Sequence, residues 1–349
     1  MPSVETLLRT ALVTVVISTA ACSSERQGGA DTLRFDSTGL VAVDTTFERV
    51  ISPEGDAYGF AHAMDLRFLN DSLIVLENGN ARLVVFGPDW LPARTIGRPG
   101  AGPGELAGAV SIDVWHGRVA VSEINNIRVS LFERDGRFAR SVPIPSGFGA
   151  IAFGPDGTLY VNAVDTKVYL LAVDSTGLKR PLAERAWDLY PEEELERPRP
   201  RITGTVLMAV DSSGDIHLYD KLIGALLTYD PEGNRTGVAF LPEDLRDGLR
   251  EQNAVVLSDF GGSPNDAVAT ATDLTMTDDG RLLLLFPAVD RVIGLLIDPA
   301  SMRATAIRRP GKPSGTTRVR GGATGVLHHG VFYQLLGDEV NTYVLRPEG

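Results

Sequence analysis

The sequence predicts an all-β fold, a six-bladed β-propeller closed by an N-terminal strand. Short runs of alternating apolar residues recur along the chain, and such a period of two is typical of strands rather than helices. A unit built from these runs repeats six times, which is typical of propeller architectures. The 37 glycines and 21 prolines are spread between the runs, where they mark turns.

The clearest copy of the repeat begins with an alternating strand at Ile112 and Val114. A His116-Gly117 turn leads to a second strand, and a third strand ends in Phe132. The first turn of the six copies falls at Asp71, Gly117, Gly157, Gly214, Gly280 and Gly330. Their spacing fits blades of about 40–50 residues, with longer intervals that predict insertions at 181–206 and 240–270.

Ring closure requires a strand from the other end of the chain. Six packed blades bury nearly every sheet face, but the sixth copy has only three strands and ends near Tyr343–Leu345. The segment Leu40–Val43 alternates, and we expect it to fill the open edge. The propeller domain therefore spans 39–349.

Helix is a minor component of the predicted fold. No stretch beyond residue 30 sustains an apolar helical stripe over four turns. The best candidate is 242–252, where Pro242 leads and acidic residues fill the first turn.

The N-terminus has the pattern of an export signal. Residues 10–21 are apolar or small and too few to span a bilayer, which needs about 20, so we interpret 1–21 as a signal peptide. The single cysteine, Cys22, follows directly. The polar composition that follows predicts a flexible tether over 22–38.

The segment Thr19-Ala20-Ala21-Cys22 resembles a bacterial lipobox, although that motif prefers leucine where Thr19 stands. The resemblance implies a lipoprotein signal peptide, lipidation of Cys22 and anchoring in the membrane by acyl chains. Ser23 resembles the pattern that directs lipoproteins to the outer membrane. A plain cleaved signal peptide is the alternative.

Two further motifs carry a family resemblance. Residues 96–106 (IGRPGAGPGEL) resemble the inter-blade turn of NHL-repeat propellers, with Leu106 in place of an aromatic residue. The turns Glu77-x-x-Asn80-x-Arg82 and Glu123-x-x-Asn126-x-Arg128 resemble the family's Asp-x-x-Asn-x-Arg, and the turn with Asn341 is a degenerate copy. The whole chain is similar to six-bladed bacterial lipoproteins of unassigned role.

Carboxylates recur near the predicted inner rim, about one in each blade, and converging oxygens of this kind would suit calcium. They are Asp65, Glu77, Glu123, Asp165, Asp220, Asp290 and Asp338. Apart from this calcium possibility the sequence predicts no cofactor. The five histidines show no metal-ligand spacing, and His116 and His329 occupy equivalent turns. We expect structural roles for the turn residues Asn80, Arg82, Asn126, Arg128 and Asn341.

The net charge of −12 disfavours nucleic acids and anionic surfaces as partners. No nucleophile motif is present. The sequence therefore favours a monomeric, non-catalytic binding or scaffold module, lipid-anchored in the envelope, with an envelope protein or a small molecule as ligand. The activities of related propellers suggest the alternative function, that of a metal-dependent lactonase- or lyase-like hydrolase with its site at the central mouth. RNA binding, seen in some NHL propellers, is a minor alternative.

The predicted insertions are candidate contact surfaces, because long loops on rigid scaffolds often carry function. The first contains Trp187, Tyr190 and the acidic run Glu192–Glu194, which makes it the better candidate. Solvated decoration is the competing interpretation.

Overall fold

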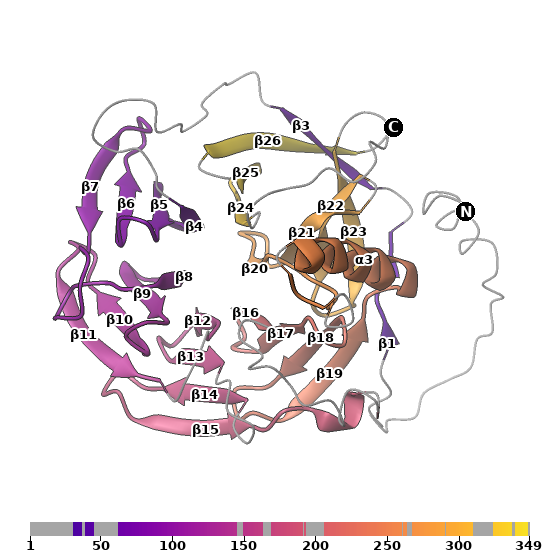
Figure 1. Cartoon of the computed structure of the whole chain (residues 1–349), viewed down its shortest axis with the longest axis horizontal. Helices are drawn as coiled ribbons and strands as arrows, with labels where there is room; N and C mark the ends of the chain where they lie inside the picture. The colour runs from indigo at the N-terminus through magenta and orange to yellow at the C-terminus, as the bar shows by residue number, and fades with distance from the viewer. Residues whose placement is uncertain are drawn as a thin grey trace.

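The computed structural model describes residues 31–36, 39–44, 62–144, 149–162, 169–190, 192, 206–259, 261–263, 267–289, 291–309, 324–336 and 339–347. These residues form six blades, each an antiparallel meander, arranged around a central axis (Figure 1). The predicted six-bladed β-propeller is confirmed.

The first three blades are consecutive four-stranded meanders whose first strand lies nearest the axis (Figure 1). Blade 1 consists of β4 (Ala63–Leu69), β5 (Ser72–Glu77), β6 (Arg82–Phe86) and β7 (Pro92–Ile96). Blade 2 consists of β8 (Ala109–Trp115), β9 (Arg118–Glu123), β10 (Arg128–Phe132) and β11 (Phe138–Pro143). Blade 3 consists of β12 (Ile151–Phe153), β13 (Leu159–Asn162), β14 (Leu170–Val173) and β15 (Lys179–Ala183).

The remaining blades repeat this order. Blade 4 consists of β16 (Val206–Val210), β17 (Ile216–Asp220), β18 (Ala225–Tyr229) and β19 (Arg235–Phe240). Blade 5 consists of β20 (Asp273–Met276), β21 (Leu282–Val289), β22 (Val292–Asp298) and β23 (Arg303–Arg308). Blade 6 has three strands from the C-terminal part of the chain, β24 (Thr324–His328), β25 (Val331–Leu336) and β26 (Glu339–Pro347).

The fourth strand of blade 6 is β3 (Leu40–Asp44), as the sequence predicts. β3 pairs antiparallel with β26, and Val43 and Ala42 lie opposite Val344 and Leu345. β3 also pairs parallel with the end of β23, where Leu40 lies opposite Ile307. The N-terminal strand therefore closes the ring and joins blades 5 and 6 into one continuous sheet.

The predicted tether is ordered where the structure describes it. β1 (Asp31–Thr32) pairs parallel with β19, and β2 (Arg34–Phe35) pairs parallel with β23. Leu33 between them is buried. A flexible tether over the whole of 22–38 is therefore wrong for 31–36, because the outer edges of blades 4 and 5 offer free backbone groups that this segment satisfies.

Six hydrophobic clusters form the core, one between each pair of neighbouring blades. In β5, Leu73 and Val75 pack toward blade 6, whereas Ile74 and Leu76 pack toward blade 2. Both faces of such a strand are apolar because both are covered. The ring arrangement supplies a partner for every blade face.

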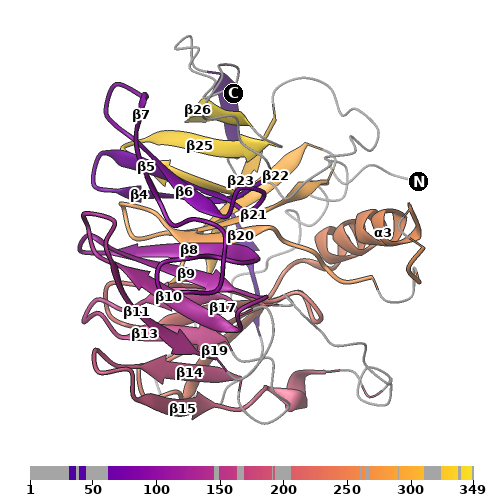
Figure 2. The same ribbon diagram turned by 60° about the vertical axis from the view of Figure 1, so that its left-hand side comes forward.

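In every blade the first strand begins, the second ends and the fourth ends at the same edge, because each blade is an antiparallel meander. All inter-blade connections therefore lie on one face, called here the insert face. The longest described connection contains α3 (Glu243–Asp259), which projects from this face (Figure 2). The turns between first and second strands lie on the opposite face, called here the hairpin face.

α3 begins where the sequence predicts a helix over 242–252 but continues to Asp259. Only Leu245 and Leu249 are buried along it, in the cluster between blades 4 and 5. So few buried positions leave a weak apolar stripe, which is why the sequence pattern underestimates the length of the helix.

The described part of the first insertion contains a short 3-10 helix, Trp187–Leu189. Tyr190 is buried against blades 3 and 4, whereas Glu192 is exposed. Glu193 and Glu194 lie outside the described residues. No helix among the described residues is both long and apolar enough to cross a membrane.

Candidate functional site at the propeller axis

A buried polar cluster lies where the innermost strands of blades 1, 5 and 6 begin. Asp65 of β4 and Asp273 of β20 each stand directly before a buried leucine of their strand, Leu66 and Leu274. Thr324 of β24 donates hydrogen bonds from Oγ1 to both carboxylates, at 3.2 Å to Asp65 Oδ1. Three blades therefore contribute to one cluster beside the axis.

Arg67 of β4 forms ion pairs with both carboxylates. Its Nη1 donates to Asp65 Oδ1 at 2.6 Å, and its two terminal nitrogens donate to Asp273 Oδ2 and Oδ1 at 3.2 and 3.1 Å. The side chains of Arg67, Asp65 and Asp273 are only 14%, 7% and 8% exposed. The bidentate geometry links blades 1 and 5 across the closing blade.

The axial carboxylates also accept hydrogen bonds from the backbone of the next blade. Ile112 N donates to Asp65 Oδ2 at 2.9 Å, and Gly325 N donates to Asp273 Oδ2 at 3.1 Å. In the same way, Phe153 N donates to Asp113 Oδ2 at 2.6 Å. These bonds hold blade 1 to blade 2, blade 5 to blade 6 and blade 2 to blade 3.

The buried setting shifts several pKa values. Burial raises the pKa of Asp65 to about 7, against the opposing attraction of Arg67. Burial also raises the pKa of Asp113 above its ordinary value. Lys221, which follows β17 in blade 4, has its pKa lowered to about 8 by burial, although Asp273 and Asp220 attract its charge. Such shifts are common at functional sites and in structural ion networks.

The predicted rim carboxylates at the ends of second strands are engaged by hydrogen-bond donors. Glu77 accepts from Asn80 Nδ2 and, at 2.6 Å, from Arg82 Nε. Asp220 accepts from the hydroxyls of Tyr169, at 2.8 Å, and Tyr190, and from Leu222 N. Both carboxylates are fully buried. These donors to Glu77 come from its own blade, whereas Asp220 also joins blade 4 to Tyr169 of blade 3.

Glu123 has the same environment in blade 2. Its carboxylate accepts from Arg128 Nε at 2.9 Å, Asn126 Nδ2 at 2.6 Å and Ala107 N at 3.0 Å. The hydroxyl of Ser130 donates to it as well. The side chain is fully buried, and both oxygens are engaged.

Arg128 connects this turn to the glycine-rich segment between blades 1 and 2. It donates to the carbonyl oxygens of Ala101, Gly102 and Glu105 at 2.9, 3.1 and 2.7 Å. Gly100 has a φ of 146°, a conformation that favours glycine, and a Cβ atom there would lie 2.2 Å from Glu105 Oε2. Asn126 donates to Gly100 O at 3.2 Å. Arg128 and Asn126 of the turn motif thus hold the connection between blades 1 and 2 by hydrogen bonds.

The predicted site residues are therefore only partly brought together. Asp65 belongs to the axial cluster, whereas Glu77, Glu123 and Asp220 are held in separate blades. Asn341 lies in β26 opposite Gln334. Asp165, Asp290, Asp338 and Cys22 lie outside the described residues. Within the described ranges, the one group of three potential metal ligands is Asp71, His328 and His329, on the hairpin face.

The sequence interpretation missed Arg67, Asp273, Thr324 and Lys221. The register of the repeats contains a signal for Asp273, because it precedes a leucine equivalent to the one that follows the predicted residue Asp65 in blade 1. Nothing in the sequence marks Arg67 as the residue that joins them, since its partners come from blades far along the chain.

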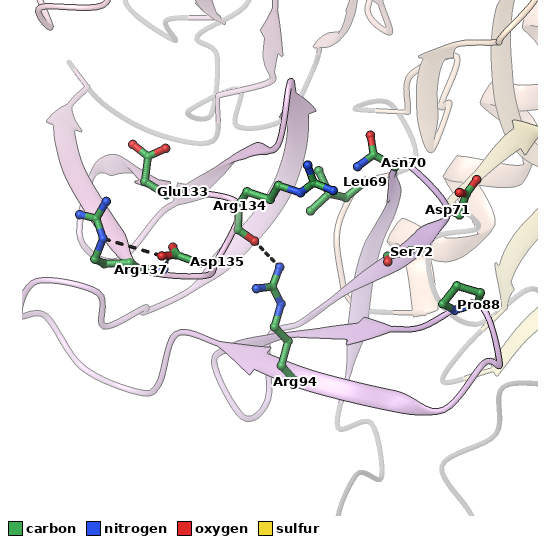
Figure 3. Close-up of a pocket in the computed structure, with 10 residues that line it drawn as sticks. All are labelled: Leu69, Asn70, Asp71, Ser72, Pro88, Arg94, Glu133, Arg134, Asp135 and Arg137. Atoms are coloured by element: carbon green, nitrogen blue, oxygen red, sulfur yellow. Dashed lines mark hydrogen bonds and ion pairs between the residues drawn. The ribbon is translucent and has the colours of Figure 1, made fainter.

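A depression of about 690 Å³ lies on the hairpin face between blades 1 and 2 (Figure 3). Charged side chains dominate its lining, which contains Leu69, Asn70, Asp71, Ser72, Pro88, Arg94, Glu133, Arg134, Asp135 and Arg137. Arg94 donates to the Arg134 carbonyl oxygen, and Arg137 lies 4.0 Å from Asp135 (Figure 3).

Comparison with solved structures supports the fold. The chain is similar to a protein of unknown function from Bacteroides thetaiotaomicron, with a TM-score of 0.54, 10% identity and coverage of 89% of this chain and 75% of that one. It is also similar to virginiamycin B lyase from Staphylococcus aureus bound to quinupristin, with a TM-score of 0.52, 10% identity and coverage of 89% and 100%. A streptogramin B lyase is similar as well, with a TM-score of 0.51, 12% identity and coverage of 84% of this chain and 81% of that one.

At these identities the likeness shows the propeller fold alone. No family model matches the chain, and no curated protein matches it. The function must therefore be argued from this chain's own residues.

Proposed function

We propose that the protein is a non-catalytic binding module that a lipid on Cys22 holds in the bacterial envelope, at the outer membrane. The observation that carries the proposal is the insert face: the inter-blade connections, including projecting α3, emerge there from a rigid ring. Binding residues on natural scaffolds concentrate on such loops. The glycine-rich turn and the two Glu-x-x-Asn-x-Arg turns support a place among NHL-type propellers.

The geometry of the rim argues against a central metal centre. A calcium ion takes six to eight oxygen ligands. Glu77, Glu123 and Asp220 already accept hydrogen bonds from guanidinium, amide, hydroxyl or backbone donors. Recruiting them to an ion would break those bonds and leave buried arginines without partners, which is costly. A hydrolase or lyase that depends on an axial metal is therefore the weaker proposal.

α3 offers the best-defined contact surface of the insert face. Its middle is fixed to the ring: Arg250 donates to Leu222 O at 3.2 Å, and Gln252 donates to Ala288 O. Its second half carries Val255 and Val256, which are 47% and 48% exposed. The helix has five carboxylates and two guanidinium groups. A partner with apolar and basic side chains would complement this surface.

A protein partner fits α3 better than a small molecule does. Small ligands bind in concave sites that bury most of their surface, whereas the exposed valines lie on a projecting helix. The described depression lies on the hairpin face instead. We therefore propose an envelope protein as the partner, contacted through the C-terminal half of α3.

The position of the first described residues is compatible with a membrane anchor. β1 and β2 lie on the outer edges of blades 4 and 5 (Figure 1). The nine residue steps from Cys22 to Asp31 can span about 30 Å when fully extended. A lipid on Cys22 would thus keep the ring close to the bilayer.

The test uses the full chain in its native bacterium, with a photocrosslinking amino acid at position 256. The matched control places it at exposed position 137, on the hairpin face. We expect one discrete crosslinked protein from position 256, lost when Val255→Asp is added, and none from position 137. Absence of a product at position 256, or the same product from both positions, would contradict the proposed surface.

Anchoring has a separate test. We expect Cys22→Ala to abolish labelling of the protein by radioactive fatty acid and to release it from the membrane fraction. Labelling that persists in this variant would overturn the lipid attachment.

A further inference from the structure

We propose that the hairpin face holds a divalent transition-metal ion of the zinc class between Asp71, His328 and His329, which joins the closing blade to blade 1. Asp71 lies in the turn between β4 and β5. His328 ends β24, and His329 follows it in the turn to β25. One ligand atom of each residue lies within 4.8 Å of those of the other two.

Ring closure brings these residues together from distant parts of the sequence. The first turns of all blades lie on the hairpin face, and blade 6 is adjacent to blade 1. Phe68 of β4 stacks on His328, with ring centroids 3.9 Å apart and planes at 20°. This contact orients the His328 ring beside the turn that contains Asp71.

His328 has a nitrogen available for a metal. Its Nδ1 lies 3.3 Å from Asp278 Oδ2, in the first turn of blade 5. Its Nε2 is buried and has no hydrogen-bond partner among the described residues. A histidine that donates one N–H to a carboxylate and presents the other nitrogen is the usual arrangement of a metal-binding imidazole. Asp278 is therefore assigned as the positioning residue.

His329 is held by its backbone. Its N–H donates to Asp278 Oδ2 at 2.7 Å, and its φ of 48° places it in the left-handed region before Gly330. Its Nε2 lies 3.8 Å from Asp71 Oδ1, which is too long for a hydrogen bond. Metal–ligand bonds of about 2.0–2.2 Å on each side bridge such a separation.

The chemistry of the three ligand groups indicates which metal ions fit the site. Two imidazoles and one carboxylate suit zinc, cobalt, nickel or copper rather than calcium, which takes oxygen ligands. His329 and Asp71 are 72% and 78% exposed, so an ion can enter from solvent. Asp71 also lines the depression between blades 1 and 2, so a fourth coordination position can hold water there.

The test titrates cobalt(II) into the full chain in detergent and records the visible absorption of low-coordinate cobalt. Every sample carries Cys22→Ser, so that no thiol competes. We expect a saturable one-to-one signal that zinc displaces. His328→Gln, His329→Asn and Asp71→Asn should each weaken binding at least tenfold, and Asp278→Asn should weaken it about 10–100-fold, as is usual for a residue that orients a metal ligand.

The matched control is His116→Asn. His116 has a φ of 45° and precedes Gly117 in the equivalent turn of blade 2. Asparagine tolerates this conformation at both positions, so both variants should fold, which circular dichroism verifies. We expect unchanged cobalt affinity in His116→Asn. The absence of a cobalt signal in the parent chain, or equal affinities for the parent and His329→Asn, would overturn the proposal.

Discussion

The polar side chains on the two faces of the propeller differ in how fully they are hydrogen-bonded. Toward the insert face, Asp65, Asp273, Glu77 and Glu123 are buried and receive hydrogen bonds from arginines, amides, hydroxyls and backbone N–H groups. On the hairpin face, His328 keeps a buried nitrogen without a hydrogen bond, and exposed Asp71 and His329 lie apart at 3.8 Å. The difference separates groups that hold the ring together from groups that remain able to bind a ligand.

The largest expected effect comes from Arg67→Met. The variant leaves the buried carboxylates of Asp65 and Asp273 without their shared cation. Breaking a buried ion pair in this way costs about 3–5 kcal/mol. Chemical denaturation should show this loss in the free energy of unfolding, and a loss below about 1 kcal/mol would mean that the axial cluster is not structural.

Glu123→Gln should cost less, because the side chain keeps its shape and one acceptor oxygen. The variant leaves buried Arg128 without its anion and turns an amide donor toward existing donors. We expect a loss of about 1.5–3 kcal/mol in the free energy of unfolding. Unchanged stability would show that the turn motif is not a structural ion pair and would reopen the rim as a ligand site.

Lys221→Met should raise the free energy of unfolding at neutral pH, in contrast to the two preceding variants. The pKa of Lys221 is about 8 in the folded protein and ordinary, near 10.5, in the unfolded chain. As the pH falls from 10.5 to 8, the unfolded chain gains a proton that the folded protein does not bind, so folding loses stability. At pH 7 the variant should be more stable than the parent by up to about 3 kcal/mol.

The pH dependence provides the control for that variant. The stability gap between Lys221→Met and the parent should shrink as the pH rises from 8 toward 10.5. A gap that stays constant over this range would show that the charge of Lys221 is not the cause.

The smallest effect is expected for a surface ion pair. Arg281 and Asp279 lie 2.6 Å apart, but their side chains are 35% and 53% exposed. Exposed pairs contribute about 0–1 kcal/mol, so Arg281→Gln should change the free energy of unfolding by less than 1 kcal/mol. A loss as large as that of Arg67→Met would remove the distinction between buried and exposed networks.

Much of the fold is predictable because each blade repeats the same physical pattern. Alternating apolar strands and glycine turns identify six units, and the missing fourth strand of the last unit points to Leu40–Val43. The parallel pairing of β1, β2 and β3 with outer strands is not predictable, because any short segment with free backbone groups can join an open edge.

The sites are harder to predict than the blades. Arg67 meets Asp273 only because ring closure brings blade 1 beside blade 6, across a long sequence separation. His329 resembles His116 in its turn, so the repeat itself suggests a shared turn role. What distinguishes His329 is the neighbourhood of Asp71 and Asp278, which come from turns of the two adjacent blades.

Thermal unfolding with added metal ions tests the contrast between the two faces most directly. The full chain carrying Cys22→Ser would be compared with the same chain plus His329→Asn or plus Glu123→Gln. We predict that zinc raises the unfolding temperature of the parent and of the Glu123 variant, but not of the His329 variant, and that calcium raises none. Stabilisation by calcium, or a zinc effect lost with Glu123 and kept without His329, would contradict the account.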